Sequence, residues 1–417
     1  MKKIIKNKRC RSCKKQNLKR VLKYENSPIG DDYRKYPHIH EKFPIELYLC
    51  KSCGLSQLLH VINPNILYSK YIYKTEDSPG LVKHFKNFAT NVTKKLNLKK
   101  NSKILDIGSN DGVLLKEFKK KSHIVCGIEP AKKISDEANK KNIKTYNDFL
   151  NQKLSKKILT KEGQFDLIVS NNVFANVDNI NQWAEDIKIL LKKSGSYVFE
   201  TYYLYKLLKN KVFDFIYHEH LTSFSVKPLC KFFETHNLVL YDVDLISTKG
   251  GSIRCYVAHK GKRKVTKNVK YFVKKENDYG IFKEKRFITF QKEINLLANK
   301  TYNFLSKAKL SSKNKKKEIK IIGYGASISC TTLLYHYKIK NFLDYIVDDN
   351  KVKLNRYLPG SNIKVERSKK LFKTKPDLVL ILAWRFSKMI IKNLKKLKGK
   401  TRIKVIIPCP KFKVIKL

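Results

Sequence analysis

Four consecutive polar residues stand within the segment DFIYHEHLTSFS, residues 214–225: Tyr217, His218, Glu219 and His220. Apolar residues flank them, and such a density of titratable groups is a poor filling for a hydrophobic core. Histidine titrates near physiological pH and serves as a general acid or base, while tyrosine and glutamate can stabilise charge or orient an imidazole. The segment is therefore typical of a catalytic site that moves a proton.

Two other interpretations of this segment stay open. On an extended strand His218 and His220 would share one face, and the H-x-H spacing also occurs among metal ligands. A catalytic metal would need further carboxylate or histidine ligands, and none stands in an obvious motif. The four residues could also form a polar cluster that serves only the structure.

Four of the nine cysteines form two C-x-x-C pairs, made of Cys10 with Cys13 and Cys50 with Cys53. Each pair can offer two thiolates to one tetrahedral zinc ion, and the strand-like segment FPIELYLC leads into the second pair. A redox pair would need only one C-x-x-C, so the spacing favours zinc. Because four thiolates leave no open coordination position, we expect this zinc to be structural.

A glycine-rich turn follows an apolar run in the segment SKILDIGSNDGVLLKEFKKK, residues 102–121. The pattern predicts a strand, a tight turn and an amphipathic helix, with backbone close to a ligand at the helix N-terminus. About twenty residues later the next predicted strand ends at Glu129, whose carboxylate could accept hydrogen bonds from a ribose diol. The turn departs from the dinucleotide motif because residue 110 is Asn, and a purely structural turn is the alternative. The turn residues predicted to meet a ligand are Asp106, Gly108, Asp111 and Gly112.

The order of the motifs and predicted elements divides the chain into three domains, which comprise residues 1–75, 76–310 and 311–417. The central domain continues with further predicted strands, the last two as an antiparallel pair, and the spacing of apolar residues over 262–310 predicts one or two bridging helices. The charged segment KLSSKNKKKE, residues 309–318, is interpreted as a linker. The further strands are predicted over 165–174, 194–201, 238–246 and 252–260.

The last domain repeats the pattern of strand, glycine turn and helix in IKIIGYGASISCTTLLYHY, which carries Gly323 and Gly325. A second predicted strand ends in Asp348 and Asp349, and two more follow with a basic helix between them. The sequence therefore predicts a second, small Rossmann-like domain. Two nucleotide-type folds in one chain suggest a ligand for each.

The formal net charge is +55, with 90 Lys and Arg residues against 35 acidic ones. The lysines are scattered over every segment, which favours a bias in residue usage over a basic stripe, so nucleic acid is not expected as the main partner. An acidic small substrate would still benefit from this field. No apolar run approaches the ~20 residues of a membrane span, and the start of the chain lacks an apolar signal region. We expect a soluble cytoplasmic protein, and the sequence carries no signal for an oligomeric state.

Taken in order, SNNVFANVD, FETYYL, YHEHLTSFS, KGGSIRCYV and GYGA, with the two cysteine pairs, resemble the deoxysugar C-methyltransferase family over nearly the whole chain. The DIGSNDG turn resembles the first motif of S-adenosylmethionine-dependent methyltransferases. The resemblance implies an α/β class I methyltransferase core between a small zinc-binding domain and a C-terminal Rossmann-like domain. It implies S-adenosylmethionine and structural Zn²⁺ as cofactors. The implied substrate is a nucleotide-linked ketosugar, held between the core and the last domain and methylated beside its ketone.

By this resemblance, His220 is the base that removes the proton next to the ketone, with Tyr217 and Glu219 as its partners and His218 as a supporting polar residue. Further cofactor contacts are implied at Ser109, Asn147, Asp148, Phe149, Asn171 and Asn172. Contacts with the acceptor are implied at Tyr71 or Tyr73, Asn176, Lys249, Gly250, Gly323, Tyr324, Gly325 and Asp349.

Some positions depart from the family pattern. Relatives commonly carry histidine where this chain has Asn176, and histidine where it has Lys249; GYGA is often followed by P-A-K-G, where this chain has residues 327–330 as SISC. Asn176 can donate a hydrogen bond but cannot titrate. The departures suggest a sub-branch with an acceptor other than the usual thymidine-linked ketosugar. Methyl transfer to oxygen or nitrogen of another acidic metabolite or glycan precursor, and an RNA-binding or RNA-methylating protein with zinc, are the alternatives.

Overall fold

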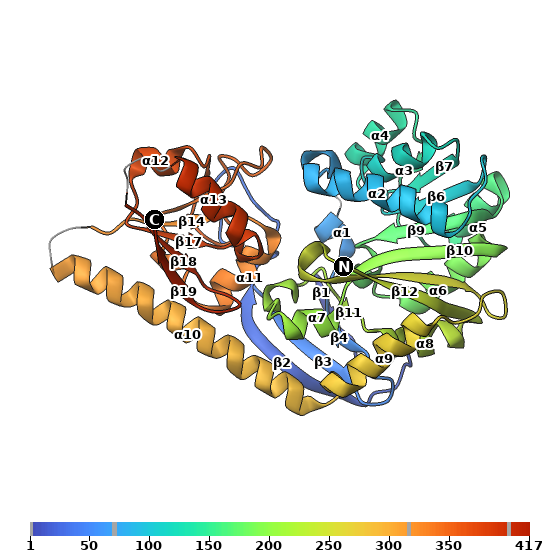
Figure 1. Cartoon of the computed structure of the whole chain (residues 1–417), viewed down its shortest axis with the longest axis horizontal. Coiled ribbons are helices and arrows are strands. Elements are labelled where there is room, and N and C mark those ends of the chain that lie inside the picture. The colour runs from blue at the N-terminus through green and yellow to red at the C-terminus, as the bar shows by residue number, and fades with distance from the viewer. Residues whose placement is uncertain (1–2, 69–72, 315–317, 398–401) are drawn as a thin grey trace. The chain divides into compact units, whose positions relative to one another are not determined.

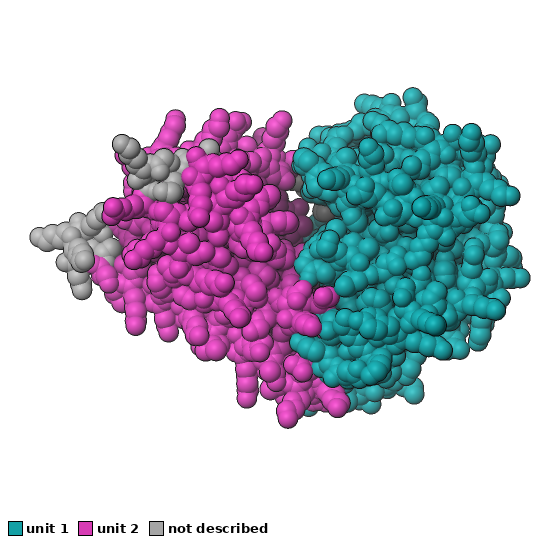
Figure 2. All heavy atoms as spheres, in the orientation of Figure 1, with its two compact units in different colours: residues 1–19, 48–205, 219–282 teal, residues 20–47, 206–218, 283–417 magenta. Residues whose placement is uncertain are grey.

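The computed structural model describes residues 3–68, 73–314, 318–397 and 402–417 (Figure 1). The chain forms two compact units, each assembled from three separate segments (Figure 2). No helix in the described ranges combines the length and the apolar character needed to cross a membrane. The three domain boundaries given above stay a prediction. Unit 1 comprises residues 1–19, 48–205 and 219–282, and unit 2 comprises residues 20–47, 206–218 and 283–417.

Unit 1 is built around a seven-stranded sheet with the strand order β12-β13-β10-β9-β6-β7-β8. Its first five strands along the chain run parallel, and β13 runs antiparallel to both β10 and β12. The predicted α/β core with a terminal antiparallel pair is confirmed. The strands are β6 (Lys103–Ile107), β7 (Ile124–Ile128), β8 (Thr145–Tyr146), β9 (Phe165–Asn171), β10 (Leu191–Tyr202), β12 (Leu238–Ile246) and β13 (Ser252–His259).

One face of this sheet is covered by α2 (Pro79–Lys95) and α3 (Val113–Lys119). Phe85, Phe88 and Val92 stand three or four residues apart on α2, so they form one apolar stripe. This stripe packs with the apolar face of α3 on Ile104 and neighbouring strand residues. Further helices of unit 1 are α1 (Pro64–Tyr68), α4 (Lys132–Lys140), α5 (Gln152–Glu162), α6 (Ile180–Leu190), α8 (Val226–Thr235) and α9 (Lys267–Tyr279).

Short strands hold the cysteine pairs of unit 1. The chain start pairs with a later segment, as β1 (Ile4–Lys6) runs antiparallel to β5 (His60–Ile62). The strand β4 (Ser56–Leu58) pairs antiparallel with β11 (Thr222–Ser223), which follows the YHEH motif. The strand predicted to lead into the second cysteine pair is confirmed as β3 (Phe43–Cys50). The motif and the cysteine pairs are therefore joined by backbone hydrogen bonds.

Unit 2 contains a six-stranded sheet in the order β16-β15-β14-β17-β18-β19, in which only β19 is antiparallel to its neighbour. This confirms the second strand, glycine turn and helix unit, formed by β14 and α11. The six strands are β14 (Ile321–Tyr324), β15 (Tyr345–Val347), β16 (Val365–Glu366), β17 (Leu378–Ile381), β18 (Lys404–Ile407) and β19 (Lys413–Lys416). Helices of this unit include α11 (Ile328–His336), α12 (Lys370–Thr374) and α13 (Ser387–Leu397). Most of β2 (Leu18–Ser27), which lies in a different sheet, also belongs to unit 2.

Two local expectations need correction. The helix α10 (Glu284–Asn314) continues into the segment interpreted as a linker, because residues 309–314 contain neither Gly nor Pro to end it. The YHEH residues form a turn directly after η3 (Phe213–Phe215), and the Leu221 amide donates to the Glu219 carbonyl at 3.2 Å. The argument that His218 and His220 share one face of a strand is therefore wrong.

Candidate active site

The glycine-rich turn lies where the strand order of unit 1 reverses. The chain passes from β6 to β7 and β8 on one side, and returns to β9 on the other side of β6. Ligands of open α/β sheets bind at the carboxyl ends of the strands at such a point. Gly108 has φ +74°, and a Cβ there would lie 2.4 Å from Cγ2 of Val173. Its amide and that of Ser109 both donate to the Ile128 carbonyl, at 2.8 and 3.0 Å, which fixes the turn beside Glu129.

Three carboxyl groups are buried around this turn, those of Asp106, Asp111 and Glu129. Burial and the neighbouring charge of Glu129 raise the pKa of Asp106 to about 8. Burial also raises the pKa of Glu129, although the amides of Asn110 and Ala131 donate to its carboxylate at 3.0 and 2.8 Å. The oxygen atoms of these carboxyl groups suit the hydroxyls of a ribose, and a protonated Asp106 can also donate a hydrogen bond.

Several polar atoms beside the turn are buried without a hydrogen-bond partner in the described part of the chain. They are Oγ of Ser109, Oδ1 of Asp111 and both amide atoms of Asn171, which ends β9. Buried polar atoms are normally paired, so a group of orphans at one strand edge points to a ligand that supplies the missing partners. These residues fit a nucleoside cofactor with hydroxyl, amine and carboxylate groups.

The other predicted cofactor residues are placed less simply. Asn172 has φ +61° and donates its amide to the Glu200 carbonyl at 2.8 Å. The Asn147 side chain donates to the carbonyls of Glu129 and Pro130, both at 3.0 Å, so it supports the loop that carries Glu129. Asp148 accepts the amide of the next residue, Phe149, at 2.7 Å. Gly112 has φ +78° and precedes α3.

His220 is buried and stacks on Tyr202, with ring centroids 4.6 Å apart and an interplanar angle of 28°. The Tyr202 hydroxyl donates to the Thr222 carbonyl at 2.9 Å, which ties this ring to the strand that follows the motif. Tyr202 stands at the carboxyl end of β10, next to β9 in the sheet. The structure thus brings His220 to the end of the sheet that carries the glycine turn.

Glu219 has a neighbour that the sequence did not indicate, Tyr68, at the end of α1 (Pro64–Tyr68). Burial and the charge of Glu219 hold the pKa of Tyr68 well above its ordinary value, while the nearby Asn176 side chain opposes this rise. The Tyr68 ring also contacts Phe149, with centroids 6.3 Å apart. Asn176, predicted to meet the acceptor, therefore lies with Tyr68 and Glu219 in one group.

The remaining predicted residues of the motif and its surroundings can be placed individually. Tyr217 and His218 are buried within unit 2, where Nε2 of His218 lies 3.1 Å from the Phe43 carbonyl, because the division between the units falls before Glu219. Tyr71 lies outside the described residues. The Tyr73 carbonyl accepts a hydrogen bond from the Asn110 side chain at 3.0 Å.

The predicted acceptor residues of the two glycine segments occupy special backbone positions. Lys249 and Gly250, in η4 (Thr248–Gly250) of unit 1, have φ +54° and +85°. In unit 2, Gly325 has φ +100°, and a Cβ there would lie 2.4 Å from that of Ala383. Burial, followed by the charges of Asp349 and Asp348, raises the pKa of Tyr324. Gly323, also in unit 2, packs closely on Leu382 and Ile346. The Asp349 carboxylate accepts hydrogen bonds from the amide and the hydroxyl of Ser368.

Cys10, Cys13, Cys50 and Cys53 place their sulfur atoms within 4.8 Å of one another. The Sγ atoms of Cys10 and Cys53 are 3.7 Å apart, and those of Cys13 and Cys50 are 3.6 Å apart. A tetrahedron with Zn–S bonds of about 2.3 Å has edges of about 3.8 Å, so these two separations match those expected for four thiolates on one zinc ion. No other group of at least three His, Cys, Asp or Glu in the described ranges could hold a metal, which removes support for the H-x-H interpretation.

A charged network that no sequence motif indicated lies beside Asn171 and is centred on Glu200. Glu200 of β10 is buried and pairs in register with Asn171 and with Arg254. Its carboxylate accepts two hydrogen bonds from Arg254, at 2.7 and 2.9 Å, and lies 2.6 Å from Nε2 of His84. These residues are distant in sequence and belong to no short motif, so only the sheet register reveals them.

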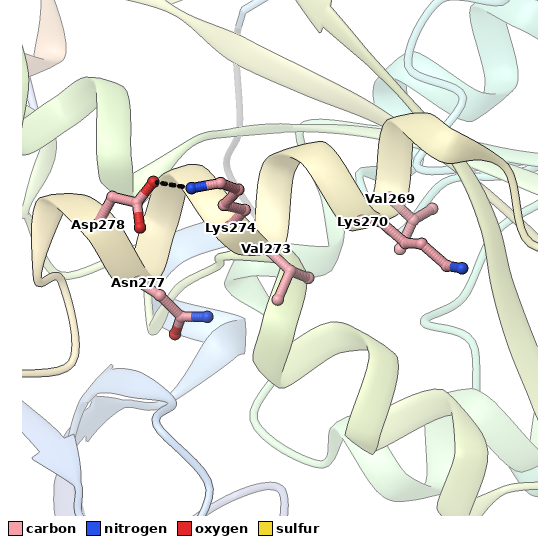
Figure 3. A pocket seen from close by; sticks show the side chains of 6 residues that line it. All are labelled: Val269, Lys270, Val273, Lys274, Asn277 and Asp278. Atoms are coloured by element: carbon pink, nitrogen blue, oxygen red, sulfur yellow. Dashed lines mark hydrogen bonds and ion pairs between the residues drawn. The ribbon is translucent and has the colours of Figure 1, made fainter.

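A hollow elsewhere on unit 1 contains none of the predicted residues (Figure 3). Its lining comes from α9 alone, and the ion pair between Lys274 and Asp278, at 3.1 Å, lies at one end of it. A surface lined by a single helix and crossed by an exposed ion pair offers little to hold a substrate. The better candidate for an active site is the carboxyl edge of the unit 1 sheet, where the glycine turn and His220 lie.

Comparison with known proteins agrees with this architecture. Family models match three successive parts of the chain: a zinc binding domain over residues 10–68, a methyltransferase domain over residues 80–243, and a C-methyltransferase C-terminal domain over residues 247–410. The chain is an S-adenosylmethionine-dependent methyltransferase that is similar to C-methyltransferases. The C-methyltransferase NovU of Streptomyces niveus is 28% identical to it over 380 residues, which cover 89% of this chain and 88% of NovU.

Solved structures also resemble parts of the chain. An S-adenosylmethionine-dependent methyltransferase from Clostridium acetobutylicum has 16% identity and a TM-score of 0.35, covering 43% of this chain and 92% of that chain. The PH0226 protein from Pyrococcus horikoshii has 13% identity and a TM-score of 0.38, covering 47% and 99%.

The three matched domains agree with the features of the site. The orphaned atoms around the glycine turn fit S-adenosylmethionine, and the four thiols fit the zinc of the first matched domain. The match with a C-methyltransferase domain favours transfer to carbon over transfer to oxygen or nitrogen, and it gives no support to an RNA-binding function.

Proposed function

We propose that this methyltransferase methylates the carbon next to the ketone of a nucleotide-linked ketosugar, with His220 as the base. The observation that carries the proposal is the grouping at the carboxyl edge of the unit 1 sheet. There a buried imidazole stacks on Tyr202, and the adjacent Glu219 lies with Tyr68 and Asn176. A carbon beside a carbonyl becomes nucleophilic only after it loses a proton, which is why this reaction needs such a base.

The residues of this group have complementary roles in the proposed reaction. The His220 imidazole takes the proton from carbon, and its stacking on Tyr202 limits the orientations that the ring can adopt. Because burial and Glu219 keep Tyr68 protonated, its hydroxyl is a hydrogen-bond donor for the oxygen on which negative charge develops. The side chain of Asn176 lies near the Tyr68 hydroxyl, and its amide does not take part in proton transfer.

The cofactor would be held by the residues around the glycine turn. Glu129 would accept hydrogen bonds from the ribose, while Asp106, Ser109 and Asn171 would contact the remaining polar groups. When bound, S-adenosylmethionine supplies an electrophilic methyl group to the carbanion that the base has produced. The second Rossmann-like fold, which carries Tyr324, is a nucleotide-type fold, and by analogy of fold it supports a nucleotide-linked substrate.

The proposal is tested with a panel of nucleotide sugars and isotopically labelled S-adenosylmethionine, followed by NMR to locate the added carbon. We expect His220→Ala to bind S-adenosylmethionine normally in calorimetry but to lose most turnover. It should also fail to exchange the proton of the carbon next to the ketone with deuterated water. The exposed His38→Ala serves as the matched control. Full turnover by His220→Ala on the identified substrate would refute the assignment of the base.

A further inference from the structure

Arg11 stands between the two cysteines of the first pair, yet its side chain bonds to segments far along the chain. The residue is only 2% exposed. Its Nε atom donates to Oδ1 of Asp178 at 2.8 Å, and Nη1 donates to the Leu58 carbonyl and, at 3.5 Å, to that of Leu221. A guanidinium is costly to bury, so bonds that repay this cost also fix the groups that accept them.

Gln57 connects the same arginine to a cysteine of the zinc centre. Its side-chain oxygen accepts the Arg11 amide at 3.0 Å and Nη1 of Arg11 at 3.4 Å. Its side-chain nitrogen donates to Sγ of Cys10 at 3.1 Å. A hydrogen bond to a zinc-bound thiolate orients that ligand, so the position of Gln57 depends on whether the four thiolates are gathered on a metal.

The chain segment that carries His220 is held by this linkage. The Leu58 amide donates to the Leu221 carbonyl at 2.8 Å, and Gln57 stands opposite Thr222 in the pairing of β4 with β11. Leu221 directly follows His220, so the carbonyl that accepts from Leu58 and Arg11 belongs to the residue next to the imidazole. Tyr202 holds the same segment from the sheet, through ring stacking and its bond to Thr222.

We propose that Arg11 and Gln57 are positioning residues through which the zinc centre sets the orientation of the His220 segment. This inference rests on the proposed role of His220 as the base. The zinc thus does more than stabilise its own small domain. The strand β4 pairs with β11, which follows the turn that carries His220, and the Arg11 guanidinium donates to carbonyls on both sides of this pairing. Loss of zinc, or of the Arg11 side chain, frees the turn without altering the glycine turn that holds the cofactor.

Hydrogen–deuterium exchange tests the linkage without any substrate. The variants are Arg11→Met and Gln57→Leu, which keep all four cysteines, and the matched control is Arg9→Met, which removes an exposed arginine two residues away. We expect amides of residues 220–224 to exchange about tenfold faster in both variants, and in wild-type protein stripped by a chelator, because the opening of this turn becomes easier. Arg9→Met should exchange like the wild type. Zinc is measured in every sample.

Two results would overturn the linkage: wild-type protection of residues 220–224 in both variants, or wild-type protection after zinc is removed. A kinetic readout separates this failure from failure of the proposed function. We expect Arg11→Met to lower kcat about 100-fold while its S-adenosylmethionine affinity stays unchanged, because a small misplacement of the base is costly. If His220→Ala is fully active, the role of the base is wrong, and the exchange data still decide whether zinc holds the turn.

Discussion

Individual residues at the carboxyl edge of the unit 1 sheet carry most of the chemical information. The cysteine pairs and the glycine turn could be found from the sequence because each is a local pattern whose chemistry needs close spacing. Tyr68 and the Glu200 network could not, since their contacts with Glu219, His84 and Arg254 arise only from folding. One signal was present, the run of tyrosines in YSKYIYK, but nothing local distinguishes which of them faces the site.

Tyr68→Phe tests the proposed donor for the developing enolate oxygen. The substitution keeps the ring that contacts Phe149 and removes only the hydroxyl, which lies near Asn176. We expect kcat to fall by about 10²-fold or more, as for other donors to a developing oxyanion. S-adenosylmethionine affinity should stay the same. Steady-state kinetics and calorimetry measure both values; an unchanged kcat would assign the donor role to another group. Tyr36→Phe, at an exposed tyrosine, is the control.

Among the elements, regular strands and helices were predictable because their apolar periodicity is local, as the agreement of 238–246 with β12 illustrates. The turn at Tyr217 to His220 was not, because nothing in its sequence forbids an extended strand. Its shape is set by the hydrogen bonds of the Leu221 carbonyl to β4. Helix α10 ran past its predicted end because charge alone does not stop a helix.

Helix α8 begins on a buried carboxylate from a neighbouring helix. Glu276 of α9 accepts the amides of Val226 and Lys227, at 2.5 and 3.0 Å, and the hydroxyl of Tyr203 at 2.8 Å. These bonds satisfy donors that the first turn of α8 would leave unpaired. Burial nevertheless dominates and raises the pKa of Glu276 from 4.5 to about 7. The helix start is therefore sensitive to pH.

Glu276→Gln should change how the free energy of unfolding depends on pH. A folded-state pKa raised above the unfolded value stabilises the fold below pH 4.5, and this contribution is lost as pH rises through about 7. Relative to the variant, the wild type should lose up to about 3 kcal/mol between pH 5 and pH 8. Urea unfolding of both proteins at the two pH values measures the difference. Parallel pH dependences would contradict the raised pKa.

The molecule as a whole is assembled from segments that alternate between its two units. Each unit takes three pieces of chain, and the division before Glu219 cuts through a motif that looks continuous in the sequence. Periodicity reports which face of an element is buried, but it does not report which unit buries it. The same limit applies to the charge, because a net charge of +55 indicates a strong field without naming a partner.

The salt dependence of turnover distinguishes a nucleic-acid partner from a small acidic substrate for this positively charged protein. A protein that neutralises 6–10 phosphates of a nucleic acid loses about 10³–10⁵ in affinity between 50 and 200 mM salt. A methyltransferase acting on a nucleotide sugar neutralises only the few charges of one diphosphate, so we expect kcat/KM for its acceptor to fall about tenfold or less over that range. Retention of S-adenosylmethionine affinity at both salt concentrations is the internal control. A steep loss of turnover, matched by tight binding of RNA at low salt, would instead favour a polyanionic substrate for this chain.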